Sequence, residues 1–316
     1  MTVAPTRPEA AIAPPSPAEA RLAIFDAPAS SHLLSRRSLK IGDRTYRVFL
    51  ATPLEPTPAG GFPILYALDG NAIFDLLDVP LLASVSGLIV AGIGYDTALR
   101  FDPPMRSLDY TPAIDGGGPR PDPDRPDRRI GGADIMLDRL CGVLRAEVEK
   151  TLPVDAARRT LFGHSLAGLF AIYALLTRPA AFSQFIAASP SIWWNNEALL
   201  DVEARTPRDA PFDNRVFVTL GDSERRSSAT GPHWSGPAPH TLEMIRRLRC
   251  HSGIAVEATV LRGLGHAATL PASLPLALQF AATGAYPVSQ IRALSKPVAT
   301  RHGTYAEIIV EWKSQE

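Results

Sequence analysis

The segment RTLFGHSLAGLFAIYALLTR, residues 159–178, places a serine at a corner between two apolar runs. The part that ends at Ser165 is typical of a β-strand, and the part that starts at Leu166 is typical of a helix. A serine at such a corner has a strained backbone, and the residues two before and two after it must be small. Gly163 and Ala167 meet this requirement, although glycine is usual at the second position. Ser165 is therefore a candidate nucleophile, and an ordinary helix N-cap is the alternative.

Strand-like and helix-like segments alternate on both sides of this corner. Residues 87–95 form a nearly continuous apolar run, as expected of a strand that is buried on both faces of a parallel sheet. The alternation predicts an α/β fold with a mostly parallel central sheet and helices on both faces. The predicted strands are 46–53, 62–70, 87–95, 159–165, 182–193, 214–222 and 254–263, and the predicted helices are 71–85, 133–152, 166–178, 196–204, 241–253 and 271–283.

The ends of the chain and one internal segment differ in composition from the rest. Residues 1–20 contain five prolines and no long apolar run, so we expect a disordered tail followed by a single domain over residues 21–316. Residues 100–131 are rich in proline, glycine and arginine, which predicts a surface excursion too polar to pack. Its aspartates fit a solvated loop better than a cation site. The segment TYAEIIVEW, within residues 285–316, is a possible extra strand.

Composition excludes several classes of protein. Lysine plus arginine and aspartate plus glutamate both number 32 among the 316 residues, which argues against nucleic acid or a membrane as a partner. Cys141 and Cys250 are too few for a disulfide framework and lack metal-ligand spacing. The sequence shows neither a signal peptide nor a membrane-spanning run, so we expect a cytoplasmic protein.

A serine hydroxyl needs a base, and two later loops offer partners for Ser165. The strand at 214–222 ends in GDSERR, which supplies Asp222 and Glu224 as candidate acids. The strand at 254–263 leads into GLGHAATLP, and of the seven histidines only His266 directly follows a late strand. We expect His164 to point away from the serine, and His233 and His240 to lie in a polar loop that covers the site.

The segments ILYALDGNAIF, TLFGHSLAGLFAIYALL, AASPSIWWNN, VTLGDSE and GLGHAATLP resemble the esterase D-like branch of the α/β-hydrolases. The resemblance runs in order from about residue 45 to 283 and is greatest to siderophore trilactone esterases. It implies that Ser165 is the nucleophile, His266 the base and Glu224 the acid. Ala167 departs from the glycine that this branch usually has. The branch also includes S-formylglutathione hydrolases, feruloyl esterases and mycolyltransferases.

The implied reaction is ester hydrolysis through an acyl-enzyme, with no metal or organic cofactor. The oxyanion would be bound by the backbone N–H groups of Leu166 and Asn71. A ferric tris-catecholate is a bulky trianion, so cationic and aromatic side chains should contact it. The candidates are Arg106, Trp193, Trp194, Arg225 and Arg226, although core packing is the expected role for at least one tryptophan.

Four alternative functions remain open at this point. An S-formylglutathione hydrolase-like enzyme or a general carboxylesterase would use the same residues, and so would an acyltransferase that excludes water. A non-catalytic binding module would be expected to have lost the serine, the histidine or the acid, whereas this chain keeps all three.

Overall fold

The computed structural model describes residues 18–28, 31–113, 117–210, 212–226 and 234–286, together with four short strands between residues 292 and 311. The expected disordered tail lies almost entirely outside the described residues, as does His233. Among the described residues, no helix is long and apolar enough to cross a membrane. The same residues contain no cluster of histidine, cysteine or carboxylate side chains that could hold a metal ion.

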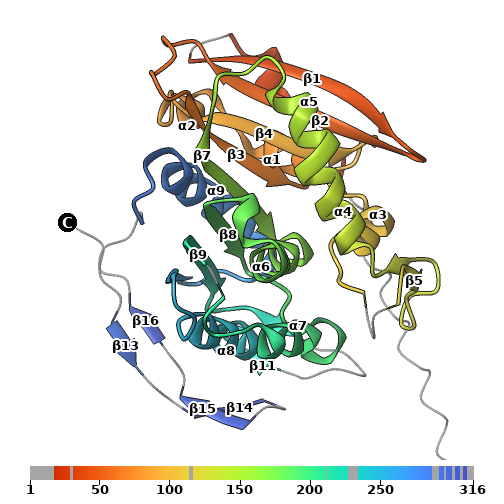
Figure 1. Ribbon diagram of the computed structural model, residues 1–316, viewed down its shortest axis with the longest axis vertical. Helices are drawn as coiled ribbons and strands as arrows, with labels where there is room; N and C mark the ends of the chain where they lie inside the picture. Colours follow the sequence, from red (N-terminus) through yellow and green to blue (C-terminus); the bar gives the residue numbers. More distant parts are fainter. Residues whose placement is uncertain are drawn as a thin grey trace, which may run out of the picture.

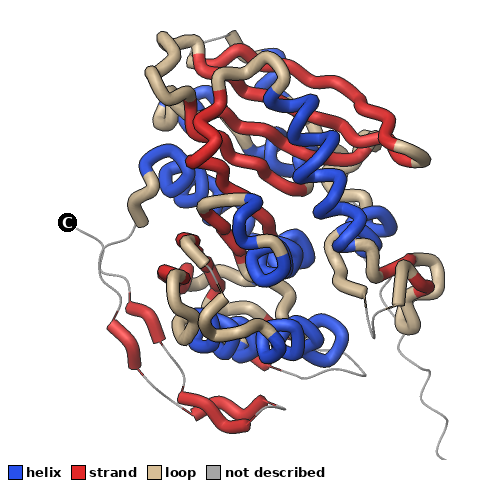
Figure 2. The backbone as a smooth tube through the Cα atoms, viewed as in Figure 1, coloured by secondary structure: helices blue, strands red, loops and turns tan. Residues whose placement is uncertain are grey.

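Eight of the described strands form one twisted sheet, which Figures 1 and 2 show running through the molecule. The two strands at one edge are antiparallel to their neighbours, and the other six are parallel to one another. This confirms the predicted mostly parallel sheet. In spatial order the strands are β1 (His32–Ile41), β2 (Arg44–Pro53), β4 (Ile89–Tyr95), β3 (Phe62–Leu68), β7 (Val154–His164), β8 (Gln184–Ala188), β9 (Asn214–Gly221) and β12 (Ile254–Leu261).

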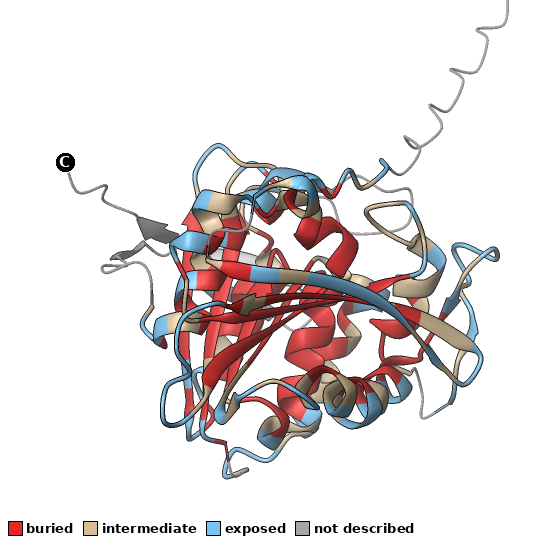
Figure 3. Cartoon of the chain, turned by 90° about the horizontal axis from the view of Figure 1, so that it is seen from above, coloured by how far each residue is buried: buried red, intermediate tan, exposed pale blue. Residues whose placement is uncertain are grey.

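Helices cover both faces of the sheet, and each face has its own apolar core (Figure 3). Leu161 packs into one core and its neighbour Phe162 into the other, because successive side chains of a strand point to opposite faces. The first core is covered by α4 (Ala133–Arg139), the π-helical turn η2 (Leu140–Leu144), α5 (Arg145–Glu149), α6 (Leu166–Thr177), α7 (Trp194–Arg205) and α8 (Pro239–Leu248). The second core is covered by η1 (Ala23–Asp26), α1 (Gly70–Leu76), α2 (Val79–Ala83) and α9 (His266–Thr283).

Several elements differ from the sequence predictions. The edge strand β1 was not predicted, because most of its side chains are exposed or half-buried and carry little apolar periodicity. The helix predicted over 133–152 is broken at Gly142, whose backbone is not helical. The helix predicted over 271–283 begins earlier, at His266, and includes Pro271 and Pro275. The strand predicted over 182–193 ends at Ala188.

The excursion at residues 100–131 is only partly a polar surface loop. Its first part forms α3 (Pro103–Asp109), and Asp109 and Tyr110 are fully buried. The hydroxyls of Tyr46 and Tyr95 donate to the Asp109 carboxylate, so burial is compatible with its polarity. The expectation that this whole segment is too polar to pack was therefore wrong. Its second part carries the short hairpin of β5 (Arg120–Pro121) and β6 (Arg129–Ile130).

The region after α9 forms two antiparallel strand pairs outside the main sheet. They are β13 (Arg292–Leu294) with β16 (Ile309–Glu311), and β14 (Pro297–Thr300) with β15 (Gly303–Ala306). The strand suspected in TYAEIIVEW is therefore present as two short pieces, β15 and β16.

Candidate active site

Ser165 lies at the corner between β7 and α6 with φ 62° and ψ −119°. A Cβ on Gly163 would lie 2.1 Å from the carbonyl oxygen of Ala167, so only glycine fits there. Ala167 itself is fully buried without such a conflict. A Cβ on Gly168 would lie 3.1 Å from Cα of Pro190, so the second close approach falls on Gly168. The departure at Ala167 therefore leaves the corner intact.

The structure brings Ser165, His266 and Glu224 together from three separate parts of the chain. His266 Nε2 lies 3.0 Å from Ser165 Oγ, and His266 Nδ1 lies 3.2 Å from Glu224 Oε2. With Nδ1–H donating to the carboxylate, Nε2 is free to accept the serine proton. This geometry matches the predicted order of nucleophile, base and acid.

Glu224 is only 3% exposed, and donors surround its carboxylate. Oε1 accepts from the hydroxyl of Ser189 at 2.7 Å and from the N–H of Gly221 at 2.8 Å. Burial acts to raise the pKa of Glu224, but the hydrogen bonds from His266, Ser189 and Gly221 outweigh it and hold the pKa below its usual value. The acid is thus kept ionised beside the base.

Asp222, the other candidate acid, forms hydrogen bonds within the neighbouring loops. Its Oδ1 accepts from the N–H of Gly263 at 2.6 Å and from the hydroxyl of Ser223 at 3.0 Å. These contacts tie together the loops that follow β9 and β12. The structure therefore places Glu224, and not Asp222, next to His266.

His266 is held at the start of α9 by residues that were not predicted to have a role. Its carbonyl oxygen accepts from Nε2 of His164 at 3.0 Å and from the hydroxyl of Thr269 at 2.7 Å. The rings of His164 and His266 lie 4.9 Å apart. Burial and then the neighbouring imidazole of His266 lower the pKa of His164 well below its usual value, so His164 stays neutral. His164 is thus directed at the base and not at Ser165 Oγ.

Ser165 opens into a pocket of about 870 Å³. Leu166, Trp193 and Trp194 line it next to the serine, and Trp194 also packs against the first core. The core role expected for one tryptophan is thereby confirmed for Trp194. The excursion contributes the remaining wall, which includes Asp122, Asp124, Arg125, Arg128 and Ile130.

The predicted arginines are placed very differently from one another. Arg106 lines the pocket, but its guanidinium is bound to Asp69 through Nε at 3.1 Å and Nη2 at 2.8 Å. Burial acts to lower the pKa of Arg106, and Asp69 more than offsets this, so the pKa is raised and the pair is ionic. Arg225 is exposed and, among the described side chains, is not part of the pocket wall. The side chain of Arg226 lies outside the described residues.

The wall that carries the tryptophans continues into an unusual turn. Asn195, Asn196 and Glu197 are all left-handed, with φ between 46° and 64°. The buried carboxylate of Glu197 lies 2.5 Å from Nδ1 of His240, which is also buried. The prediction that His240 lies in a covering loop was therefore wrong, because it belongs to α8 and anchors this turn.

The two predicted oxyanion donors differ in whether they line the pocket. Leu166 is the first residue of α6, where backbone N–H groups have no partner within the helix, and it lines the pocket. Asn71 is buried, and its side chain bonds to the N–H and C=O of Tyr95. Asn71 is not part of the pocket wall that the described residues form.

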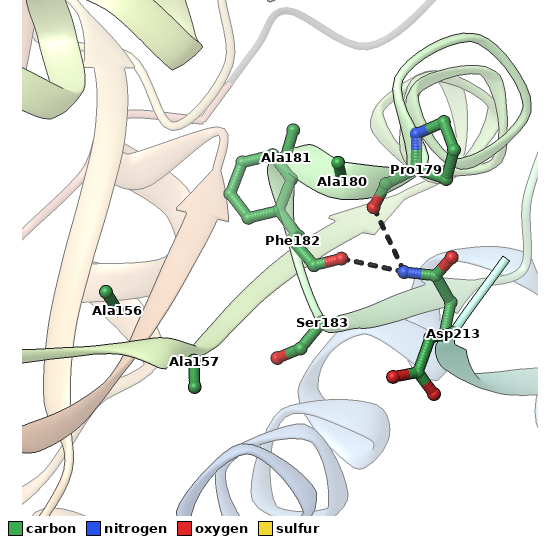
Figure 4. Close-up of a pocket in the computed structure, with 9 residues that line it drawn as sticks. Ala156, Ala157, Pro179, Ala180, Ala181, Phe182, Ser183 and Asp213 are labelled. Atoms are coloured by element: carbon green, nitrogen blue, oxygen red, sulfur yellow. Dashed lines mark hydrogen bonds between the residues drawn. The ribbon is translucent and has the colours of Figure 1, made fainter. Parts of the chain in front are cut away.

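A second hollow, of about 270 Å³, lies near the amino ends of β7, β8 and β9 (Figure 4). It is lined mainly by small residues, and Asn214 at its rim donates to the carbonyl oxygens of Pro179 and Phe182. Ser183 and Asn214 precede or begin strands β8 and β9, whereas ligands of open parallel sheets bind at the carboxyl ends. The larger pocket at Ser165 is therefore the candidate active site.

Comparisons with known proteins agree with this fold and site. The family described as "Putative esterase" matches residues 139–232. The ferri-bacillibactin esterase BesA of Bacillus subtilis (strain 168) is 33% identical over 259 residues, which cover 76% of this chain and 85% of that protein. A solved structure of the enterobactin and salmochelin hydrolase IroE is 29% identical with a TM-score of 0.67, and the match covers 83% of this chain and 99% of that one. Another, of the BES protein from Bacillus cereus, is 30% identical with a TM-score of 0.65 and matches 81% of this chain and 97% of that one.

The strand order, the serine corner and these similarities define an α/β-hydrolase. The chain belongs to the putative-esterase family of ester-hydrolysing enzymes, in the branch that contains the proteins just named. The predicted fold class and the predicted family are both confirmed.

Proposed function

We propose that this protein is a serine esterase that opens the trilactone ring of a ferric catecholate siderophore. The observation that carries the proposal is the continuous contact from Ser165 Oγ, which lines the large pocket, through His266 to Glu224. The names of the relatives support the substrate class, since they are described as esterases or hydrolases of bacillibactin, salmochelin and enterobactin. A cytoplasmic location is part of this proposal, because the opened siderophore would release its iron there.

The reaction would proceed in two acyl-transfer steps. Ser165 Oγ attacks an ester carbonyl while His266 Nε2 takes its proton, and His266 then protonates the departing alcohol oxygen. Water attacks the acyl-enzyme with His266 again as the base, which returns the free carboxylate and Ser165. The N–H of Leu166, which lines the pocket, would bind the oxyanion. A 29% identical enterobactin hydrolase has been solved in complex with DFP, a reagent that phosphorylates nucleophilic serines, and this supports the role of Ser165.

The pocket has features suited to a bulky aromatic anion. Its volume of about 870 Å³ lies at the upper end of the range of 300–1,000 Å³ that is usual for small-molecule sites. Trp193 and Trp194 offer flat surfaces for catechol rings. Arg125 and Arg128 offer positive charge from the wall that the excursion forms, where Asp122 and Asp124 also lie, whereas the charge of Arg106 is largely offset by Asp69.

The test is turnover of ferric bacillibactin, ferric enterobactin and S-formylglutathione, followed by chromatography of the products. We expect linear hydroxy-acid products from the two trilactones, and no product with Ser165→Ala, since loss of a nucleophile can lower kcat by about 10⁶. Ser165→Ala should retain the melting temperature of the parent. Turnover of the thioester without cleavage of either trilactone would contradict the substrate, and full activity of Ser165→Ala would contradict the nucleophile.

A further inference from the structure

Ser191 provides the nucleophile with a second polar neighbour that no comparison or sequence motif assigns. Its hydroxyl oxygen lies 3.2 Å from Ser165 Oγ, and the residue is only 1% exposed although it lines the active-site pocket. The contact joins the loop after β8 to the corner after β7. Ser191 therefore touches the atom at which the proposed chemistry takes place.

The backbone around Ser191 is fixed on several sides. Its N–H donates to the carbonyl oxygen of Ser165 at 3.0 Å, and the N–H of Ser189 donates to that of Thr219 at 2.7 Å. The carbonyl oxygen of Pro190 accepts from the hydroxyl of Thr241 at 3.1 Å. These hydrogen bonds hold the backbone that carries the Ser191 side chain beside Ser165.

The direction of the hydrogen bond follows from the protons available. The Ser165 hydroxyl has one proton, which it donates to His266 Nε2. Ser165 Oγ can then only accept from Ser191, so Ser191 is the donor. This donor lies on the nucleophile oxygen itself and is separate from any donor to the carbonyl oxygen of the substrate.

Such a donor acts unequally on the two halves of the reaction. In acylation, Oγ begins as a hydroxyl oxygen that already accepts the bond, so the transition state gains little. In the acyl-enzyme, Oγ is an ester oxygen, a weak acceptor because its lone pair is delocalised into the carbonyl. In deacylation, water adds to the acyl carbon, the carbon–Oγ bond breaks, and His266 returns its proton to Oγ. Oγ gains negative charge as it departs, so the bond from Ser191 strengthens in that transition state.

We propose that Ser191 is a catalytic hydrogen-bond donor that assists the departure of Ser165 Oγ from the acyl-enzyme. The proposal rests on the function proposed above for Ser165 and assigns a step to a residue beyond the triad. It predicts that removing the hydroxyl of Ser191 selectively slows deacylation.

The experiment is stopped-flow hydrolysis of p-nitrophenyl acetate, in which the first release of nitrophenolate reports acylation and the steady state reports deacylation. For Ser191→Ala we expect acylation within about threefold of the parent. We expect deacylation to be slower by about tenfold to a hundredfold, the loss typical of one hydrogen bond to a developing charge. The amplitude of the initial burst should then rise toward one equivalent per enzyme. Ser191→Cys, which has a weaker donor of similar shape, should show an intermediate deacylation rate.

Ser183→Ala is the matched control, because it also removes a serine hydroxyl. That hydroxyl donates to the carbonyl oxygen of Arg159 and lies at the amino end of β8, away from Ser165. Ser183→Ala should change neither step. Equal slowing of both steps in Ser191→Ala, or unchanged deacylation in a folded Ser191→Ala and Ser191→Cys, would overturn the role of Ser191. If the parent protein gives no nitrophenolate and Ser165 is not labelled by a fluorophosphonate, the proposed function itself fails.

Discussion

Ser165 has a backbone conformation that few non-glycine residues adopt. Its φ of 62° carries a strain of about 1–3 kcal/mol, which surrounding contacts must offset. The N–H of Ser165 donates to Ala188, and its carbonyl oxygen accepts from Ser191. The strained corner is thus held by hydrogen bonds on both sides, and Oγ stays directed at His266.

The assignment of the acid can be tested by two isosteric substitutions. Glu224→Gln should lower kcat by about 10⁴, because the base loses the charge that orients and stabilises it. Asp222→Asn should lower kcat by less than about tenfold, since the Asp222 side chain bonds, among the described residues, to Ser223 and Gly263 of the neighbouring loops. Steady-state kinetics with p-nitrophenyl acetate checks both values. The reverse ranking would assign the acid to Asp222, and two small effects would indicate a Ser–His dyad.

The lowered pKa of Glu224 also predicts how stability depends on pH. Its folded pKa lies below that of an unfolded glutamate, so its stabilising contribution is present above the unfolded pKa and is lost as the pH falls through the folded one. From about pH 5 downward, the melting temperature of the parent should therefore fall more steeply with decreasing pH than that of Glu224→Gln. Parallel melting curves for the two proteins would contradict this contribution.

At the scale of elements, the active site depends on how closely α6 turns back on β7. Gly163 on β7 touches the first turn of α6, and Gly168 within α6 touches the loop after β8. Three elements of the first core thus meet around the nucleophile, without room for an additional carbon atom at Gly163. These contacts therefore fix the position of α6 as well as that of Ser165.

Gly163→Ala should disrupt this junction. Its Cβ would lie 2.1 Å from the carbonyl oxygen of Ala167, so α6 must shift, and we expect destabilisation of several kcal/mol, about 3 or more, with loss of activity. Gly118→Ala is the control, because a Cβ there meets nothing within 4 Å. Urea denaturation measures both. A Gly163→Ala protein as stable as the control would contradict the close approach.

At the scale of the whole molecule, the balanced charge leaves no general attraction for an anionic substrate. Lysine plus arginine equals aspartate plus glutamate at 32 each, so any attraction must be local to the pocket. The wall from the excursion contains Arg125 and Arg128 as well as Asp122 and Asp124. Charge in this wall is therefore the feature through which the fold can distinguish a trianion from a neutral ester.

Arg125→Glu tests this feature, because Arg125 is exposed and lies in the pocket wall. We expect KM for a ferric catecholate trilactone to rise by about tenfold at low salt and the difference to shrink as salt is raised. KM for p-nitrophenyl acetate should not change. Arg225→Glu, an equal change of charge outside the pocket wall, is the control. Equal effects of the two variants would show that the wall does not recognise the anion.

Local residue patterns were sufficient to predict the parallel sheet, the serine corner and the chain order of Ser165, Glu224 and His266. These features depend on local spacing: the change from strand to helix periodicity at the corner, and loops that follow strand ends. Strands whose side chains are largely exposed, such as β1, and helices that continue through prolines, such as α9, gave no such local signal.

Local patterns could not predict which of the two neighbouring acids contacts His266, because this depends on how the loops after β9 and β12 meet in the folded chain. It also revealed Ser189, Ser191 and His164 as partners of the triad, since each contacts a residue that is distant in the chain or in another element. The ion pair of Asp69 with Arg106 and the pocket wall formed by the excursion also became apparent only in the folded structure, because both are contacts between elements distant in the chain. Such contacts depend on how separate elements pack against one another, and they cannot be predicted from the spacing of residues along the chain.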